Sequence, residues 1–125
     1  DIPISLCLAK KIIARRPFTT TLELAKVTGS WSRQVFQALR IAVNDELTAL
    51  KIVLPQALKI LRPAGRIVVI AYHSSEDRLV KNQFENWTRV GLGQTLTRRA
   101  VTPSPEEITA NPKSHSAKLR VFSKM

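Results

Sequence analysis

An apolar run that ends abruptly in a polar cluster constrains this chain most. Residues 67–72 read "IVVIAY", rich in β-branched side chains and without polar alternation, and "HSSEDR" follows at once at 73–78. Such a run predicts a strand covered on both faces, as in the middle of a parallel sheet. In doubly wound α/β folds, ligands bind at the carboxyl ends of the strands. The sequence therefore predicts a ligand-binding turn held by a buried strand.

Helical patterns precede this strand. A helix is expected at 4–16, and the capping-box spacing of Thr20 and Glu23 predicts a second that closes near Gly29. Apolar residues at intervals of three and four predict a long helix over 31–54. Pro55 is expected to break or kink it and to begin a further helical piece at 55–61.

Helices and strands alternate after the run. The pattern predicts a helix at 75–88 with Ser75 as candidate N-cap, a strand at 95–101, a short helix at 104–111 capped by Ser104, and a last strand at 116–122. This order predicts an α/β fold.

The charge of the chain indicates a polyanionic partner. It has 20 Lys and Arg against 9 Asp and Glu, a net charge of +11. Nucleic acid is the commonest such partner, because neutralising phosphates releases counterions. The alternative is a basic surface that is merely solvated. No apolar run approaches the length of a membrane span, so no membrane partner is expected.

The sequence lacks the usual signatures of several enzyme classes. Cys7 is the only cysteine, which excludes an intrachain disulfide, suggests a reducing compartment and is read as a small core residue. His73 and His115 are far apart and no second thiol is present, so no metal site is expected. There is no G-x-S-x-G elbow, G-x-G-x-x-G motif or Walker loop.

The first residues of the polar cluster each have two readings. His73 could hydrogen-bond a substrate or transfer a proton, or its polar atoms could be satisfied by the backbone. Ser74 could bind a phosphate or a base edge, and either Ser74 or Ser75 is expected to cap the following helix.

The charged residues of the cluster are similarly ambiguous. Glu76 and Asp77 could orient a substrate amine, or could complement the helix dipole. Arg78 could bind phosphate, or could pair with one of those acids.

The helix at 31–54 carries a second polar group. Arg33, Gln37, Arg40 and Asn44 recur at intervals of three or four on one side. They could form a solvated face, or could hold a polyanion through phosphate and base contacts. Residues 44–46 could also make a buried polar contact with the turn at 73–78.

Three stretches resemble the C-terminal part of the MraW/RsmH family: "RQVFQALRIAVNDEL", "LPQALKILRPAGRIVVIAYHSSEDRLVK" and "TPSPEEITANPKSHSAKLRVF". Members are S-adenosylmethionine-dependent methyltransferases that modify the exocyclic N4 of a cytidine in small-subunit ribosomal RNA. The similarity covers about residues 1–122. Ser75 departs from the family pattern His-Ser-Leu-Glu-Asp-Arg, which has Leu at this position.

The resemblance implies a fold. The family has a class I (Rossmann-like) methyltransferase sheet with helices on both faces, interrupted by a helical inserted domain. Residues 1–30 would be the end of that insertion, and 31–125 the C-terminal part of the methyltransferase domain. The closing strands would form an antiparallel hairpin.

The resemblance also implies site residues. His73 and Ser74 would contact the base or its phosphate, Asn44 would line the cytidine pocket, and Glu76 and Asp77 would orient the turn or the amine. Phosphates would be taken by basic residues: Arg33, Arg40, Arg78 and Lys81. No metal is implied.

The cofactor of the family is S-adenosylmethionine, bound mainly by a glycine-rich loop and an acidic residue that this sequence lacks. No cofactor-binding residue is therefore expected, and the chain alone is expected to be inactive. The strand at 67–72 would lack a neighbour, which predicts a homodimer, pairing with an N-terminal half, or poor solubility if the chain is cut from a longer protein. Ribosomal RNA would be the partner and the cytoplasm the location. The alternative is a non-catalytic RNA-binding or scaffold remnant.

Overall fold

The computed structural model describes residues 5–125, which divide into two compact units between Glu46 and Leu47. The boundary predicted at 30/31 concerns which part of the family fold each segment represents, and it stays a prediction.

The first unit is helical. It contains α1 (Ser5–Ala14), α2 (Thr21–Thr28), the 3-10 turn η1 (Gly29–Trp31) and α3 (Ser32–Asn44). The first two predicted helices are confirmed, although α1 ends at Ala14 and not at residue 16, and Ile4 lies outside the described residues. Leu8, Val27 and Val35 are buried, whereas Cys7 is exposed. The expectation of a core cysteine is therefore wrong, because the side of α1 that faces the unit's interior carries its neighbour Leu8.

Local hydrogen bonds fix the ends of α2. Thr20 Oγ1 accepts from the N–H of Glu23 at 3.3 Å, and the Glu23 carboxylate accepts from the N–H of Thr19 at 2.9 Å. Gly29 closes the helix with φ 57°. Both ends lie where the sequence predicts them, because cap residues act through local contacts.

The helical pattern at 31–54 forms two helices that separate at Asp45, not at Pro55. Asp45 adopts left-handed geometry (φ 51°, ψ 38°), which Asp tolerates better than most residues. Helix α4 (Glu46–Ile60) then runs through Pro55. Of the predicted break or kink, the break is wrong, because Leu54 and Leu58 on either side of the proline are both buried in the core and offset the lost hydrogen bond.

The second unit is built on a three-stranded antiparallel sheet with strand order β1–β3–β2. Strand β1 (Arg66–Ala71) pairs with β3 (Lys118–Lys124), and Ile67 lies opposite Phe122. Strand β2 (Gly93–Thr95) pairs with the other edge of β3. The predicted strands at 67–72 and 116–122 are thus confirmed with small shifts.

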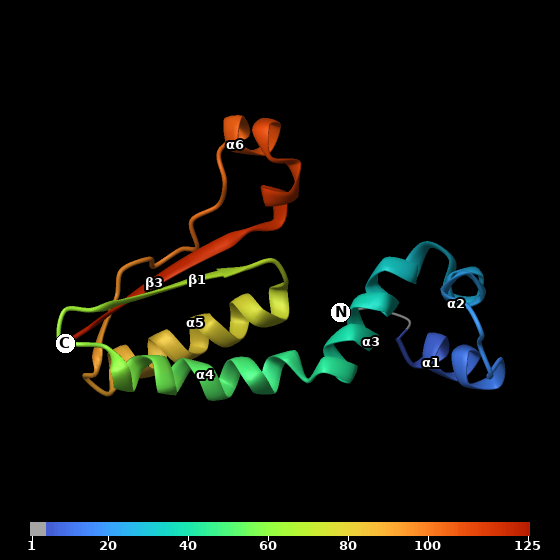
Figure 1. Ribbon diagram of the computed structural model, residues 1–125, viewed down its shortest axis with the longest axis horizontal. Helices are drawn as coiled ribbons and strands as arrows, with labels where there is room; N and C mark the ends of the chain where they lie inside the picture. The colour runs from blue at the N-terminus through green and yellow to red at the C-terminus, as the bar shows by residue number, and fades with distance from the viewer. Residues whose placement is uncertain (1–4) are drawn as a thin grey trace. The chain divides into compact units, whose positions relative to one another are not determined.

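Two helices cover one face of this sheet. In Figure 1, α4 and α5 (Ser74–Arg89) run along the same side of β1 and β3. Phe84 and Trp87 of α5 pack with Phe122 of β3, with ring centroids 5.2–5.7 Å apart. Burial of these aromatic rings, together with Leu54 and Leu58, supplies the main stabilisation of the unit.

The opposite face of β1 is open. Val68, Ile70 and Tyr72 are 57%, 53% and 51% exposed. The second edge of β1 pairs with no strand among the described residues. The prediction of a strand buried on both faces in a parallel sheet is therefore wrong for this chain. Here β1 is an edge strand, buried only on the side of Ile67 and Ala71.

The strand predicted at 95–101 lies earlier, as β2, and Val101 makes only a single bridge to Leu119. Glycine at position 93 permits the pairing of β2 with β3, because a Cβ there would collide with the Ser123 carbonyl oxygen and the Phe122 ring. Only glycine lets β2 approach β3 so closely.

The C-terminal segment also ties to α4. Lys124 Nζ donates to the carbonyl oxygens of Leu58 and Leu61 at 3.0 and 2.8 Å. A cation at the carboxyl end of a helix complements its dipole. Helix α6 (Pro105–Ala110) has the predicted Ser104 cap, and the 3-10 turn η2 (Pro112–Ser116) leads into β3.

Candidate functional site

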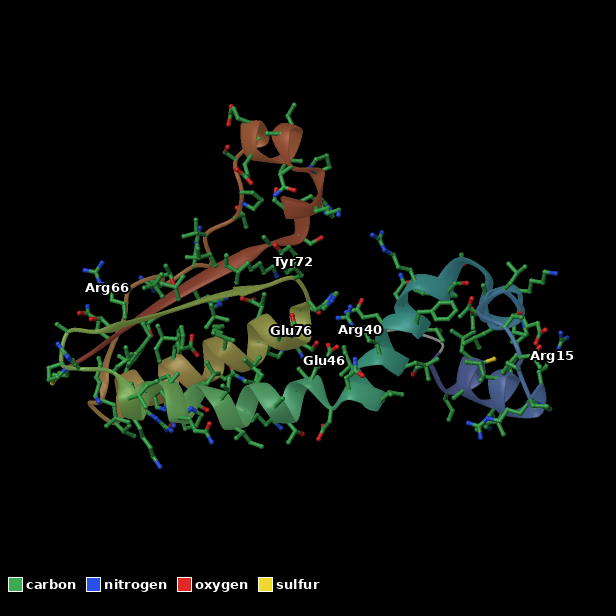
Figure 2. The ribbon with its side chains drawn as sticks, in the orientation of Figure 1. Arg15, Arg40, Glu46, Arg66, Tyr72 and Glu76 are labelled. Atoms are coloured by element: carbon green, nitrogen blue, oxygen red, sulfur yellow. The ribbon has the colours of Figure 1, made fainter. Side chains whose placement is uncertain are left out.

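The polar turn joins β1 directly to α5. His73 is the N-cap residue, with extended geometry (φ −122°, ψ 145°), and the helix begins at Ser74. The Glu76 carboxylate accepts from the N–H groups of Tyr72 and His73 at 3.4 and 3.3 Å. Figure 2 shows Glu76 at this junction. The prediction that Ser74 or Ser75 caps α5 is wrong, because the strand passes into the helix without a spacer and the cap position is His73.

Asp77 anchors the turn to the last strand. Its carboxylate accepts two hydrogen bonds from Arg120, Nε to Oδ1 at 2.6 Å and a terminal nitrogen to Oδ2 at 3.2 Å. Lys118 Nζ lies 3.8 Å from Oδ2. Both Asp77 and Arg120 are buried. The hydrogen bond from Arg120 is the largest cause that lowers the pKa of Asp77 below its ordinary value.

This lowered pKa predicts a loss of stability in acid. The pKa of Asp77 is lower in the folded than in the unfolded chain, so its contribution is complete above about pH 4 and is lost as pH falls through the folded value. Glu23 and Glu106 also have lowered pKa values and contribute to the same loss of stability. The contribution of Asp77 is therefore the difference between wild type and a variant that lacks its carboxylate. Urea unfolding from pH 7 to pH 2 should give Asp77→Asn a shallower pH dependence than wild type. Identical profiles would contradict the assignment.

Three predicted contact residues share the exposed side of α5. Ser74, Arg78 and Lys81 lie at intervals of four and three and are all exposed. Lys81 Nζ lies 3.7 Å from the Glu85 carboxylate, an exposed pair one turn apart. Exposed pairs of this kind contribute little to stability. Lys81 can therefore exchange its partner for a ligand phosphate at small cost.

Two of the predicted site residues of the first unit, Arg40 and Asn44, gather at the break between α3 and α4. The Glu46 carboxylate bonds Arg40 through two nitrogens, at 3.0 and 3.2 Å, and accepts from Asn44 Nδ2 at 3.2 Å. Arg33 is exposed earlier on α3. The predicted polar face is thus partly a local network around Glu46. Contact between Asn44 and the turn at 73–78 stays a prediction.

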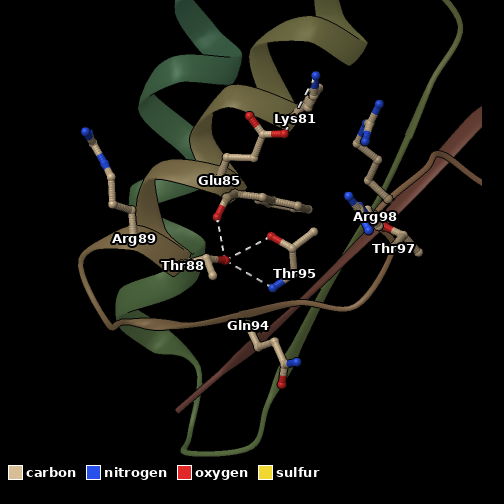
Figure 3. A pocket seen from close by; sticks show the side chains of 10 residues that line it. Lys81, Glu85, Thr88, Arg89, Gln94, Thr95, Thr97 and Arg98 are labelled. Atoms are coloured by element: carbon tan, nitrogen blue, oxygen red, sulfur yellow. Dashed lines mark hydrogen bonds and ion pairs between the residues drawn. The ribbon is translucent and has the colours of Figure 1, made fainter.

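A pocket of about 440 Å³ lies between α5 and the segment that contains β2. Its lining includes Lys81, Arg89 and Arg98, with Glu85 as its carboxylate. Figure 3 shows these side chains around the opening, with Thr88 and Thr95 hydrogen-bonded on one side. We call this the cationic pocket. Of its basic residues, only Lys81 was predicted as a contact residue.

Comparison with known protein families identifies the family of this chain. Residues 3–125 match the model of the MraW methylase family.

The chain belongs to the MraW methylase family.

Relatives named ribosomal RNA small subunit methyltransferase H agree with this assignment. The protein of Coprothermobacter proteolyticus is 47% identical over 129 aligned positions, which cover 94% of this chain and 43% of the relative. Those of Dehalococcoides mccartyi and a Nostoc species are each 42% identical, covering 95% and 97% of the chain and 41% and 43% of the relative. The chain spans less than half the length of these MraW methylase relatives.

The observed fold is consistent with the C-terminal part of a MraW methylase, with mixed helices and a small antiparallel sheet. The class I sheet and the inserted domain stay predictions. No helix within residues 5–125 is both long enough and apolar enough to span a membrane. The described side chains also contain no cluster of three or more His, Cys, Asp or Glu residues suited to a metal.

The glycines of this MraW methylase chain do not fit the cradle expected for S-adenosylmethionine. Gly65 and Gly93 pack against the chain's own carbonyl oxygens, of Arg62 and Ser123. Gly29 and Gly91 have φ of +57° and +77° and no atom near the position of a Cβ. None forms a glycine-rich loop beside an acidic ribose acceptor. No reaction step is therefore assigned to the cofactor on this chain.

Sequence reasoning missed Arg120, although a signal for it was present. In "KLRVFSK" the alternation of a strand places Arg120 on the same face as Phe122, which is a core residue. An arginine on a core face requires a buried acceptor. Asp77 was available, one turn into the helix that follows β1.

Proposed function

We propose that this chain is the C-terminal segment of an S-adenosylmethionine-dependent methyltransferase that acts on N4 of a cytidine in small-subunit ribosomal RNA. Its match to the MraW methylase family over residues 3–125 carries the proposal. The names of the relatives support the reaction and the RNA substrate. A cytoplasmic location stays a prediction.

Within this function, the turn at 73–78 orients the acceptor nucleotide. His73 and Ser74 contact the base or its phosphate, and Asn44 lines the cytidine pocket. Glu76 and Asp77 act as positioning residues, because their carboxylates already bond the turn and β3. S-adenosylmethionine would supply the methyl group, and correct orientation of the amine contributes much of the rate.

The partner proposed for the open sheet is the part of the protein that corresponds to the remaining length of the relatives. The unpaired edge of β1 and its exposed Val68 support this choice, because uncovered apolar strands associate with other strands. A homodimer formed through the same edge is the other arrangement. Size-exclusion chromatography with light scattering distinguishes a monomer from that dimer.

RNA is the proposed ligand of the cationic pocket, with Arg33, Arg40 and Arg78 as further phosphate contacts. Replacing Lys81, Arg89 and Arg98 with Gln should lower the salt dependence of binding to single-stranded RNA. With a slope of about 0.7 per phosphate contact, three lost contacts reduce the slope of log K against log salt by about 2. Fluorescence anisotropy at several salt concentrations measures this.

A matched triple variant controls for net charge. Lys10 and Lys11 are exposed on α1, Arg15 is exposed just after the end of α1, and all three lie outside the cationic pocket. Replacing these three residues with Gln removes the same net charge. It should leave the slope of log K against log salt close to the wild-type value. Equal slopes for the two triple variants would contradict a phosphate site in the pocket.

Cofactor titration tests the proposal against a non-catalytic RNA-binding or scaffold remnant. A chimera replaces the matched region of the Coprothermobacter protein with this chain. Under the proposed function, calorimetry detects binding of S-adenosylmethionine to the chimera. It also detects RNA binding to the chimera and to the 125-residue chain alone. A folded chimera that binds RNA but no cofactor would instead support the remnant.

A further inference from the structure

A second pocket adjoins the turn at 73–78 on the open face of the sheet. It has a volume of about 380 Å³. Tyr72, the residue before His73, lines it from the end of β1, and Figure 2 shows this tyrosine at that end of the strand. Glu107 of α6 and Asn111 line it from the segment between β2 and β3. We call this the Tyr72 pocket.

The chemistry of the Tyr72 pocket differs from that of the cationic pocket. Its lining contains no lysine or arginine, and its only charged residue is Glu107. Ile70, Val101 and Leu119 supply apolar walls. Such a site suits a flat, uncharged group with hydrogen-bond donors better than it suits a phosphate.

The polar groups of this pocket match one edge of a pyrimidine. The Asn111 side-chain nitrogen lies 3.4 Å from Glu107 Oε1, so an acceptor and a donor stand next to each other. Cytosine presents the complementary order, an amino group beside a ring acceptor. Uracil has a carbonyl oxygen in place of the amino group and would meet the carboxylate with an acceptor. The half-exposed ring of Tyr72 offers a stacking surface.

We propose that the Tyr72 pocket holds a cytosine base turned out of single-stranded RNA. Tyr72 stacks on the ring, Glu107 accepts from the exocyclic amine, and the Asn111 amide donates to the neighbouring ring acceptor. Tyr72 directly precedes His73 in the sequence, so the pocket lies at the end of β1 that leads into the turn at 73–78, although no residue of that turn lines it. This inference rests on the proposed function and adds the residues that select the base.

Binding by the 125-residue chain tests the proposal directly. The probes are two fluorescent RNA hexamers, an all-uridine hexamer and one with a single central cytidine. Wild type should bind the cytidine hexamer about tenfold more tightly, the size of effect that a good base contact gives. Glu107→Ala should abolish this preference with little change for the uridine hexamer. Tyr72→Leu should weaken binding of both hexamers.

Glu106→Ala is the matched control, because it removes the neighbouring carboxylate of α6 outside the pocket. It should keep the preference for cytidine. Circular dichroism verifies that each variant is folded. Equal binding of the two hexamers by wild type would overturn the proposal, and so would equal preferences in the two alanine variants.

The outcomes separate this proposal from the function on which it rests. If Glu107→Ala keeps the cytidine preference while the chimera transfers the methyl group, the base-binding role of the Tyr72 pocket is refuted and the proposed function stands. Loss of the preference in Glu107→Ala, together with a folded chimera that transfers no methyl group, would refute the reaction alone.

Discussion

Replacing Asp77 with Ala is expected to destabilise the second unit by about 3–5 kcal/mol, because it leaves Arg120 buried without its carboxylate. The side chains of the pair are only 12% and 9% exposed, so water cannot replace the lost bonds. Urea unfolding followed by circular dichroism measures the change.

The exposed pair on α5 provides the control. Glu85→Ala removes a carboxylate whose side chain is exposed, and it should change stability by less than about 1 kcal/mol. Replacing Asp77 with Leu and Arg120 with Met together should recover most of the loss, since no buried charge then remains unpaired. A loss below about 1 kcal/mol for Asp77→Ala would contradict the role of this pair.

Truncation of Phe122 to Ala is expected to cost a similar amount, about 3–5 kcal/mol. Phe122 is fully buried and contacts the rings of Phe84 and Trp87, so its removal leaves a cavity at the centre of the core. Thermal and urea unfolding both report the loss.

Val68 supplies the matched control, because it lies on the opposite face of the same sheet and is 57% exposed. Val68→Ala should cost less than about 1 kcal/mol, as expected for a site away from the core. Comparable losses for Phe122→Ala and Val68→Ala would mean that the second face is also packed, which contradicts an open face on this chain.

Local signals predicted much of the fold. Thr20, Gly29 and Ser104 act through bonds within a few residues, so cap preferences located the ends of their helices. The strand at 67–72 was predicted from its β-branched run. The environment of this strand was not predicted correctly. A run without alternation indicates that both faces of the strand are packed, but it does not show whether the packing residues belong to this chain or to another. The break at Asp45 was missed because the sequence indicated Pro55 as the breaking residue. In the structure the helices separate where Asp45 adopts a left-handed backbone conformation.

The site was predicted in part, for the same physical reason. The polar cluster was visible in the sequence because its residues are consecutive. The partnership of Asp77 with Arg120 joins residues 43 positions apart, and pairing of β1 with β3 brings them together. The Tyr72 pocket likewise depends on α6 returning toward the end of β1, which no local pattern specifies.

Methyl transfer by the chimera with the Coprothermobacter protein tests the central claim most directly. The substrate is unmethylated small-subunit ribosomal RNA with labelled S-adenosylmethionine, and the product is read as N4-methylcytidine by mass spectrometry. We predict that the chimera forms this product, that His73→Ala in the chimera lowers its rate without unfolding it, and that the 125-residue chain alone forms none. Methylation by the chain alone, or none by a folded chimera that binds the cofactor, would contradict the account.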